Sequence, residues 1–182
     1  MSAIFVRVDQ AERRLCIFAN GACRRRAIRQ TFRLVSRLGD GVFWYALMLI
    51  LPLWIWAGGG ELQSGVLASL EMLAGGAAGL VLYKALKKKL VRERPYIGLL
   101  GIECAMPPLD RYSFPSGHTL HAVTFTTIAL SHAPALAVVL VPFAMMVAAS
   151  RVVLGLHYPT DVLAGAALGF AIAKGAGLLF GG

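Results

Sequence analysis

The chain of 182 residues is strongly apolar and basic: 58% of its residues are hydrophobic, 15% are charged, and Lys and Arg exceed Asp and Glu by nine. Soluble domains are about 45–50% apolar and about 25% charged, so these charged residues are too few to cover a soluble surface. The composition excludes an ordinary soluble domain and favours one membrane domain. The basic excess is compatible with nucleic acid, an anionic membrane surface or a phosphorylated substrate.

Residues 1–40 form an arginine-rich segment without a long apolar run. Because it lacks the apolar core of a cleavable signal peptide, we expect it to be retained. Apolar residues and arginines alternate in it, a pattern typical of one or two amphipathic helices in the lipid headgroup layer, broken near Asn20 and Gly21. We therefore divide the chain into a basic interfacial amphipathic segment, residues 1–40, and a transmembrane domain, residues 41–182.

The first half of the transmembrane domain contains two apolar stretches. Residues 41–60 carry no charge and have the length needed to cross the hydrocarbon. Residues 62–83 are interrupted only by Glu71, and Gly75 and Gly79 at GxxxG spacing predict close packing on a neighbouring helix.

Three further crossings are predicted in the second half. Residues 112–150 contain no Lys, Arg, Asp or Glu and suit two short helices joined by a turn at residues 131–134. A fifth helix begins near Pro159 and runs towards Phe180. The predicted fold is an all-α integral membrane helical bundle with about five transmembrane helices and an N-terminal interfacial amphipathic helix.

The order of crossings predicts where the polar loops meet. If the chain crosses after residue 40 and returns by residue 83, the loops at 84–116 and 150–160 lie on the N-terminal side. Three polar clusters that are distant in sequence then converge on one face of the bundle.

The first cluster contains Lys87 and Arg94. They are seven residues apart, close to two helical turns, so both project from one face and could hold a dianionic group. Taken alone, basic residues after a span more often flank and orient the membrane helix.

The second cluster, Ser116, Gly117 and His118, places a hydroxyl, an unhindered N–H and an imidazole at the start of the third span. A helix N-terminus attracts phosphate, although Pro-Ser-Gly is by itself an ordinary turn and N-cap. His121 is more consistent with a packed histidine, and His132 lies in the opposite turn.

The third cluster contains Arg151, His157 and Asp161 in an otherwise apolar or small stretch. Charged groups at membrane depth tend to mark function. Asp161 lies one helical turn after His157, so its carboxylate can orient the imidazole and leave one nitrogen free as nucleophile or base. An isolated His–Asp pair at this spacing is more often structural, but three such polar clusters on one face favour a functional site.

Together, residues 87–95 (KxxxxxxRP), 115–118 (PSGH) and 150–161 (SRxxxGxHxxxD) resemble the three-part signature of the type 2 phosphatidic acid phosphatase superfamily. The third motif has one more residue than the usual SRxxxGHxxxD, and every motif position is filled. Many members have six spans, whereas five are counted here. The resemblance implies a bacterial membrane lipid phosphatase.

The resemblance also implies residue roles. His157 would attack phosphorus to form a phosphohistidine, Asp161 would orient it, and His118 would protonate the leaving oxygen and then activate water. The phosphate oxygens would be held by a set of cations and donors, namely Lys87, Arg94, Ser116, Gly117 and Arg151.

No metal or other cofactor is expected. Glu93, Glu103 and Asp110 are scattered in the sequence and form no cluster suited to Mg²⁺, and the three cysteines lack CxxC spacing. The expected partners are a lipid phosphate and the bilayer, without nucleic acid; the oligomeric state stays open.

The motifs leave the lipid open between a polyprenyl diphosphate such as undecaprenyl diphosphate, phosphatidylglycerol phosphate and phosphatidic acid. The short polar loop at residues 95–113 favours a small headgroup. The alternatives are a non-catalytic lipid-binding or transport protein that retains the site, a vanadate haloperoxidase, which the composition disfavours, and nucleic-acid binding by residues 1–40.

The resemblance implies a multi-pass protein of the bacterial plasma membrane. Seventeen of the 18 Lys and Arg residues fall on the predicted site face, and only Lys174 lies elsewhere. The positive-inside tendency would make this face cytoplasmic. Phosphate chemistry itself needs several of these cations, however, so the side of the membrane stays open.

Overall fold

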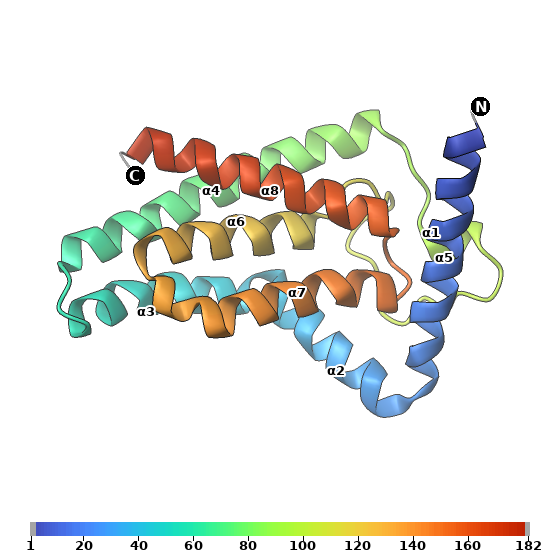
Figure 1. Ribbon diagram of the computed structural model, residues 1–182, viewed down its shortest axis with the longest axis horizontal. Helices are drawn as coiled ribbons and strands as arrows, with labels where there is room; N and C mark the ends of the chain where they lie inside the picture. Colours follow the sequence, from blue (N-terminus) through green and yellow to red (C-terminus); the bar gives the residue numbers. More distant parts are fainter. Residues whose placement is uncertain (1–2, 181–182) are drawn as a thin grey trace.

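The computed structural model describes residues 3–180, with side chains from residue 10 onward. The described residues form helices joined by turns and loops: α1 (Ala3–Gly21), η1 (Ala22–Arg24), α2 (Arg26–Arg37), η2 (Leu38–Val42), α3 (Phe43–Ala57), α4 (Leu62–Lys89), α5 (Pro95–Gly98), α6 (Gly117–His132), η3 (Pro134–Leu136), α7 (Ala137–Val153) and α8 (Pro159–Phe180). Figure 1 shows α3, α4, α6, α7 and α8 as a bundle, with α1 across one end. The predicted all-α helical bundle is confirmed.

Among the described residues, four helical stretches are long and apolar enough to cross a membrane: Arg26–Ala57, Leu62–Lys89, Pro134–Val153 and Pro159–Phe180. The helix α6 has only 16 residues, which is about 24 Å of helix and shorter than the about 30 Å of hydrocarbon. Four of the five predicted crossings therefore have the required length and composition. The crossing assigned to α6 stays a prediction.

The predicted helix boundaries agree closely with the structure, with one difference at the first span. The chain breaks after Gly21, turns at residues 131–134 and begins its last helix at Pro159, as predicted. The first candidate span, Arg26–Ala57, begins before residue 41 because it includes α2, which joins α3 across a kink in η2. Gly41 in this kink has a φ of 139°, a conformation that side chains rarely adopt.

The short helix α6 is the centre of the bundle. It packs against α4, α7 and α8, and half of its residues are buried. Trp44 from α3, Met72 from α4, Phe125 from α6 and Val147 from α7 meet in the largest apolar core cluster. This packing places the start of α6 against α4 and α8, where the sequence motifs lie.

Glycines bring α8 and α4 close to α6. A Cβ at Gly169 would lie 2.3 Å from the backbone oxygen of Leu120, and one at Gly165 would lie 2.5 Å from that of Ser116. On α4, a Cβ at Gly79 would lie 2.6 Å from the Leu120 side chain. The GxxxG spacings thus mark close helix contacts, as predicted.

Gly169→Ala should destabilise the bundle, because its methyl group would overlap a backbone oxygen that cannot move alone. We expect a loss of about 1–3 kcal/mol, measured as a lower thermal midpoint in detergent. Gly175→Ala is the matched control on the same helix, since a Cβ there meets nothing within 4 Å. Equal midpoints for the two variants would contradict the close α6–α8 contact.

Candidate functional site

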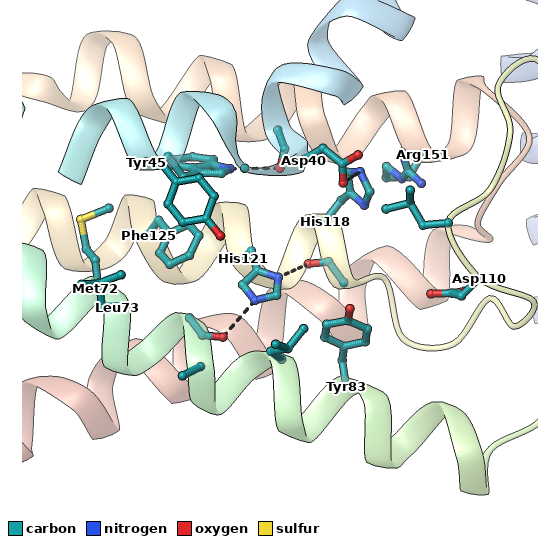
Figure 2. A pocket seen from close by; sticks show the side chains of 18 of the residues that line it. Asp40, Tyr45, Met72, Leu73, Tyr83, Asp110, His118, His121, Phe125 and Arg151 are labelled. Carbon is teal, nitrogen blue, oxygen red and sulfur yellow. Dashed lines mark hydrogen bonds and ion pairs between the residues drawn. The ribbon is translucent and has the colours of Figure 1, made fainter. Parts of the chain in front are cut away.

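A cavity of about 510 Å³ extends from side chains inside the bundle to the polar residues of the sequence motifs. Figure 1 shows α1 crossing one end of this bundle. Its inner part is lined by apolar side chains of α3, α4 and α6, including Met48, Met72 and Phe125. Its other part is polar and is lined by Asp40, Lys87, Arg94, Asp110, His118, Arg151 and His157. Figure 2 shows this change from apolar to polar along the cavity.

His157 lies in the turn between α7 and α8. The turn is closed by two hydrogen bonds, because the N–H groups of Leu156 and His157 both donate to the carbonyl oxygen of Arg151 at 3.0 Å. Gly155 makes it possible, with a φ of 75° and a missing Cβ that would lie 2.7 Å from the Glu103 oxygen. The imidazole is thereby held at the cavity wall, 1% exposed.

The contacts of His157 define its tautomer. Nη1 of Arg94 lies 3.3 Å from Nε2 of His157, and because a guanidinium only donates, Nε2 carries the lone pair. Nδ1 then carries the proton and faces Oδ2 of Asp161 at 3.6 Å, which is too far for a hydrogen bond. Burial, together with the charges of Arg151, Arg94 and Lys87, holds the pKa of His157 well below its ordinary value. The imidazole is therefore neutral at neutral pH, as a nucleophile must be.

Asp161 lies behind His157 and does not line the cavity. Its Oδ2 accepts the N–H of Tyr158 at 2.8 Å, and its Oδ1 accepts from Nη1 of Arg92 at 2.6 Å. The carboxylate is fully buried at the first turn of α8, where a helix N-terminus stabilises negative charge.

Lys87 and Arg94 converge on one carboxylate. Nζ of Lys87 lies 2.7 and 2.6 Å from the two carboxylate oxygens of Asp110, and Nη2 of Arg94 lies 2.6 Å from Oδ1. Burial alone would raise the pKa of Asp110, but Lys87 and Arg94 outweigh it and lower that pKa. An anion thus already occupies the position where these two cations could hold a phosphate.

The start of α6 places the second motif beside the cavity. Ser116 is buried, and its Oγ caps the helix by accepting the N–H of Thr119 at 3.4 Å. Gly117 and His118 line the cavity. Nε2 of His118 lies 3.1 Å from Oδ1 of Asp40, an ion-pair distance, although Nε2 makes no hydrogen bond with the described residues. Figure 2 shows this pair opposite Arg151.

Arg151 reaches the cavity from the last turn of α7 and is 2% exposed. Its Nη1 donates to the hydroxyl of Ser36 on α2, and its Nε has no partner among the described residues. A buried guanidinium with an unused donor is suited to binding an anion in the cavity.

The structure brings the predicted site residues together in two layers. Lys87, Arg94, Gly117, His118, Arg151 and His157 line the cavity. Ser116 and Asp161 lie behind them, with their side chains engaged in a helix cap and a hydrogen-bonded ion pair. His121 lies in the cavity wall and bonds to the carbonyl oxygens of Gly117 and Gly76, and His132 pairs with Glu71 at 2.7 Å.

The sequence does not predict four groups at the site: Ser36, Asp40, Arg92 and Asp110. In the sequence Asp110 is one of several scattered acidic residues, but the folded loop brings it onto Lys87 and Arg94. Asp40 carried a usable signal, because it is a single acid between two glycines just before an apolar span. Within the part of the chain that the structure describes, no group of three His, Cys, Asp or Glu residues could hold a metal ion.

Comparisons with known proteins find similar bacterial phosphatases. The chain is 38% identical over 104 residues to decaprenylphosphoryl-5-phosphoribose phosphatase of Mycobacterium tuberculosis. The aligned residues cover 54% of this chain and 55% of that protein. It is 36% identical to the phosphatase of the same name of Mycolicibacterium smegmatis, over 51% of each chain. The chain thus spans about half the length of the curated relatives it matches.

Two crystal structures share the fold over most of the chain. Aquifex aeolicus LpxE superposes with a TM-score of 0.74 and 25% identity, covering 90% of this chain and 92% of that one. A transmembrane PAP2 type phosphatidylglycerolphosphate phosphatase from Bacillus subtilis superposes with a TM-score of 0.71 and 24% identity, covering 94% and 85%.

The PAP2 superfamily profile matches residues 68–180, a range that contains all three motifs. Because this range is more than half of the chain, the protein is a multi-pass membrane member of the PAP2 superfamily.

Proposed function

We propose that this protein hydrolyses the terminal phosphate of a membrane lipid phosphate or diphosphate through a phosphohistidine at His157. The observation that carries the proposal is a single cavity with a neutral, buried imidazole among Lys87, Arg94 and Arg151 at one end and apolar walls at the other. The cations suit a phosphate and the apolar walls suit the first part of a lipid chain.

In the first step, Nε2 of His157 attacks phosphorus. The N–P bond forms as the bond between phosphorus and the lipid oxygen breaks. The leaving oxygen keeps the electron pair of that bond and accepts a proton from protonated His118, which becomes neutral. Nδ1 keeps its proton, which faces Asp161. Lys87, Arg94, Arg151 and the N–H of Gly117 stabilise the charge on the equatorial oxygens, which is where most of the rate enhancement of phosphoryl transfer lies.

In the second step, His118 takes a proton from a water molecule, which attacks phosphorus and breaks the N–P bond. The products are inorganic phosphate and His157 with its lone pair restored. Ser116, assigned to phosphate binding from its motif, contributes in this scheme by capping the helix turn that presents Gly117.

The substrate class is supported by the relatives. The curated relatives act, by name, on decaprenylphosphoryl-5-phosphoribose phosphate, so a polyprenyl-linked phosphate joins undecaprenyl diphosphate, phosphatidylglycerol phosphate and phosphatidic acid as candidates. The second candidate function is non-catalytic lipid binding or transport. The enzyme is favoured because the Nε2 lone pair of His157, which Arg94 contacts, lies in the cavity wall with three cations.

We further propose that residues 1–40 lie in the headgroup layer. Phe18 on α1 is 82% exposed, and Leu15 and Ile17 are also exposed on the same helix. Exposure of these apolar side chains to water is unfavourable, and lipid would cover them.

His157→Ala should abolish phosphate release from a panel of lipid phosphates, by at least about 1,000-fold, while the protein stays folded. The matched test of the intermediate uses His118→Ala with p-nitrophenyl phosphate, whose leaving group needs no proton. That variant should release one equivalent of nitrophenol and then accumulate acid-labile phosphate on the protein. Full turnover by His157→Ala would overturn the mechanism, whereas absent turnover in the unchanged protein would leave the non-catalytic binding function.

Hydrolysis should continue without divalent metal, because Lys87, Arg94 and Arg151 supply the positive charge that a metal would otherwise provide. We expect phosphate release to be equal before and after treatment of the purified protein with EDTA. Activity that is lost in EDTA and recovered with Mg²⁺ would show that the reaction needs a metal.

Asp110→Asn should strengthen inhibition by inorganic phosphate, because the Asp110 carboxylate competes with phosphate for Lys87 and Arg94. For a partly exposed pair of this kind we expect an inhibition constant roughly two- to fivefold lower, with kcat changed little. A higher inhibition constant would mean that Asp110 instead holds the two cations in place for the phosphate.

A further inference from the structure

A buried carboxylate outside the family-matched range contacts the site from behind. Glu12 on α1 is 7% exposed. Its Oε1 accepts the backbone N–H of Thr160 at 2.8 Å and the Thr160 hydroxyl, and its Oε2 accepts from Nη2 of Arg92 at 2.8 Å. A charge this buried is tolerated only when it is paired, and all of these partners lie near the first turn of α8.

Arg92 is shared between two carboxylates. Nη2 donates to Glu12, Nη1 donates to Oδ1 of Asp161 at 2.6 Å, and the guanidinium lies 4.0 Å from the ring centroid of Tyr158. Burial alone would lower the pKa of Arg92, but the two carboxylates outweigh it and raise that pKa. Arg92 therefore stays charged and is held in one orientation from three sides.

Through Arg92, the carboxylate of Asp161 is held at one orientation behind His157. One oxygen is held by Arg92 and the other by the N–H of Tyr158, and the second oxygen faces Nδ1 of His157. Since one cation, Arg92, is shared between two anions, Glu12 and Asp161, the three groups together keep a net negative charge. That charge acts on the proton of Nδ1, which His157 must keep during attack.

We propose that Glu12 and Arg92 are positioning residues that act on the nucleophile through Asp161. Arg92 fixes the orientation of the Asp161 carboxylate, and Glu12 offsets the positive charge of Arg92 so that Asp161 still supports the proton on His157. The role of Glu12 and Arg92 in catalysis rests on the phosphatase function proposed above, whereas their electrostatic coupling to His157 does not. Because Glu12 lies on α1, the proposal also makes α1 part of the site.

The proposal predicts two shifts of opposite sign in the titration of His157. Removing the positive charge in Arg92→Gln stabilises the imidazolium, so the titration midpoint should rise by about one pH unit. Removing the negative charge in Glu12→Gln should lower the midpoint. The other groups that face His157 are unchanged in both variants: Lys87 from α4, Arg94 after it, His118 from α6, Arg151 from α7 and Asp161 from α8.

The midpoints can be measured by NMR of the full chain in detergent with ¹⁵N-labelled histidine. The chain has only four histidines, so the His157 signal is identified by its absence in His157→Ala. Glu71→Gln is the matched control, because Glu71 is also a buried carboxylate, paired with His132 away from the site. It should leave the His157 midpoint unchanged.

Turnover supplies the second readout. In both variants kcat should fall about tenfold while KM for a lipid phosphate changes by less than about threefold, since neither residue touches substrate. The acid limb of kcat/KM should move with the His157 midpoint. Arg92→Lys keeps the charge but loses the planar fork with which Nη1 and Nη2 each hold one carboxylate, so it should lower kcat with the midpoint near that of the unchanged protein. If Arg92→Gln does not fold, the kcat of Arg92→Lys tests the proposal in its place.

Identical His157 midpoints in the charge-removing variants and the unchanged protein would overturn the proposal. So would a raised KM with an unchanged kcat, which would place Arg92 on the substrate. The two proposals fail separately: absent turnover in the unchanged protein, with shifted midpoints in the variants, refutes the phosphatase function and retains the coupling to His157.

Discussion

Charged groups buried at the end of an apolar bundle must be neutralised by one another, and the arrangement of this site follows from that requirement. Lys87, Arg94 and Arg151 are all less than a tenth exposed, and an unpaired charge at such depth costs several kcal/mol. With Arg92 there are four cations at the site, and four carboxylates lie near them, those of Glu12, Asp40, Asp110 and Asp161. Lys87, Arg92 and Arg94 pair directly with carboxylates, and Asp40 lies beside His118. The charges of these cations and carboxylates therefore balance in number without a ligand.

The carboxylates of this network differ in how readily a bound phosphate could displace them. Asp110 lies on the two cations of the first motif, in a loop and 37% exposed, so it can be displaced. Asp161 is fully buried behind His157 and held by two donors, so it stays. In the proposed mechanism a dianionic phosphate would displace Asp110 from its two cations, whereas Asp161, which would orient the nucleophile, would stay in place.

The N-terminal helices complete the polar end of the bundle. Glu12 contacts Arg92 and Thr160, Ser36 accepts from Arg151, and Asp40 lies beside His118. Nδ2 of Asn20 donates to the carbonyl oxygens of Glu103, in the loop after α5, and of Val153, the last residue of α7, and its Oδ1 accepts the N–H of Glu103. These residues all precede the range matched by the family, yet they neutralise or orient groups within it.

The sequence by itself determined the helical membrane class, most helix boundaries and the three motifs, because apolar runs, prolines, glycines and motif spacings are local properties of the chain. Only the tertiary structure decided that α6 is a short central helix, that Ser116 and Asp161 stand behind the cavity wall, and that Asp110 and Arg92 belong to the site. Asp110 is 23 residues from Lys87, and Glu12 is 80 from Arg92. Pairing of buried charges at such separations depends on how loops and helices pack, and no periodicity in the sequence records it.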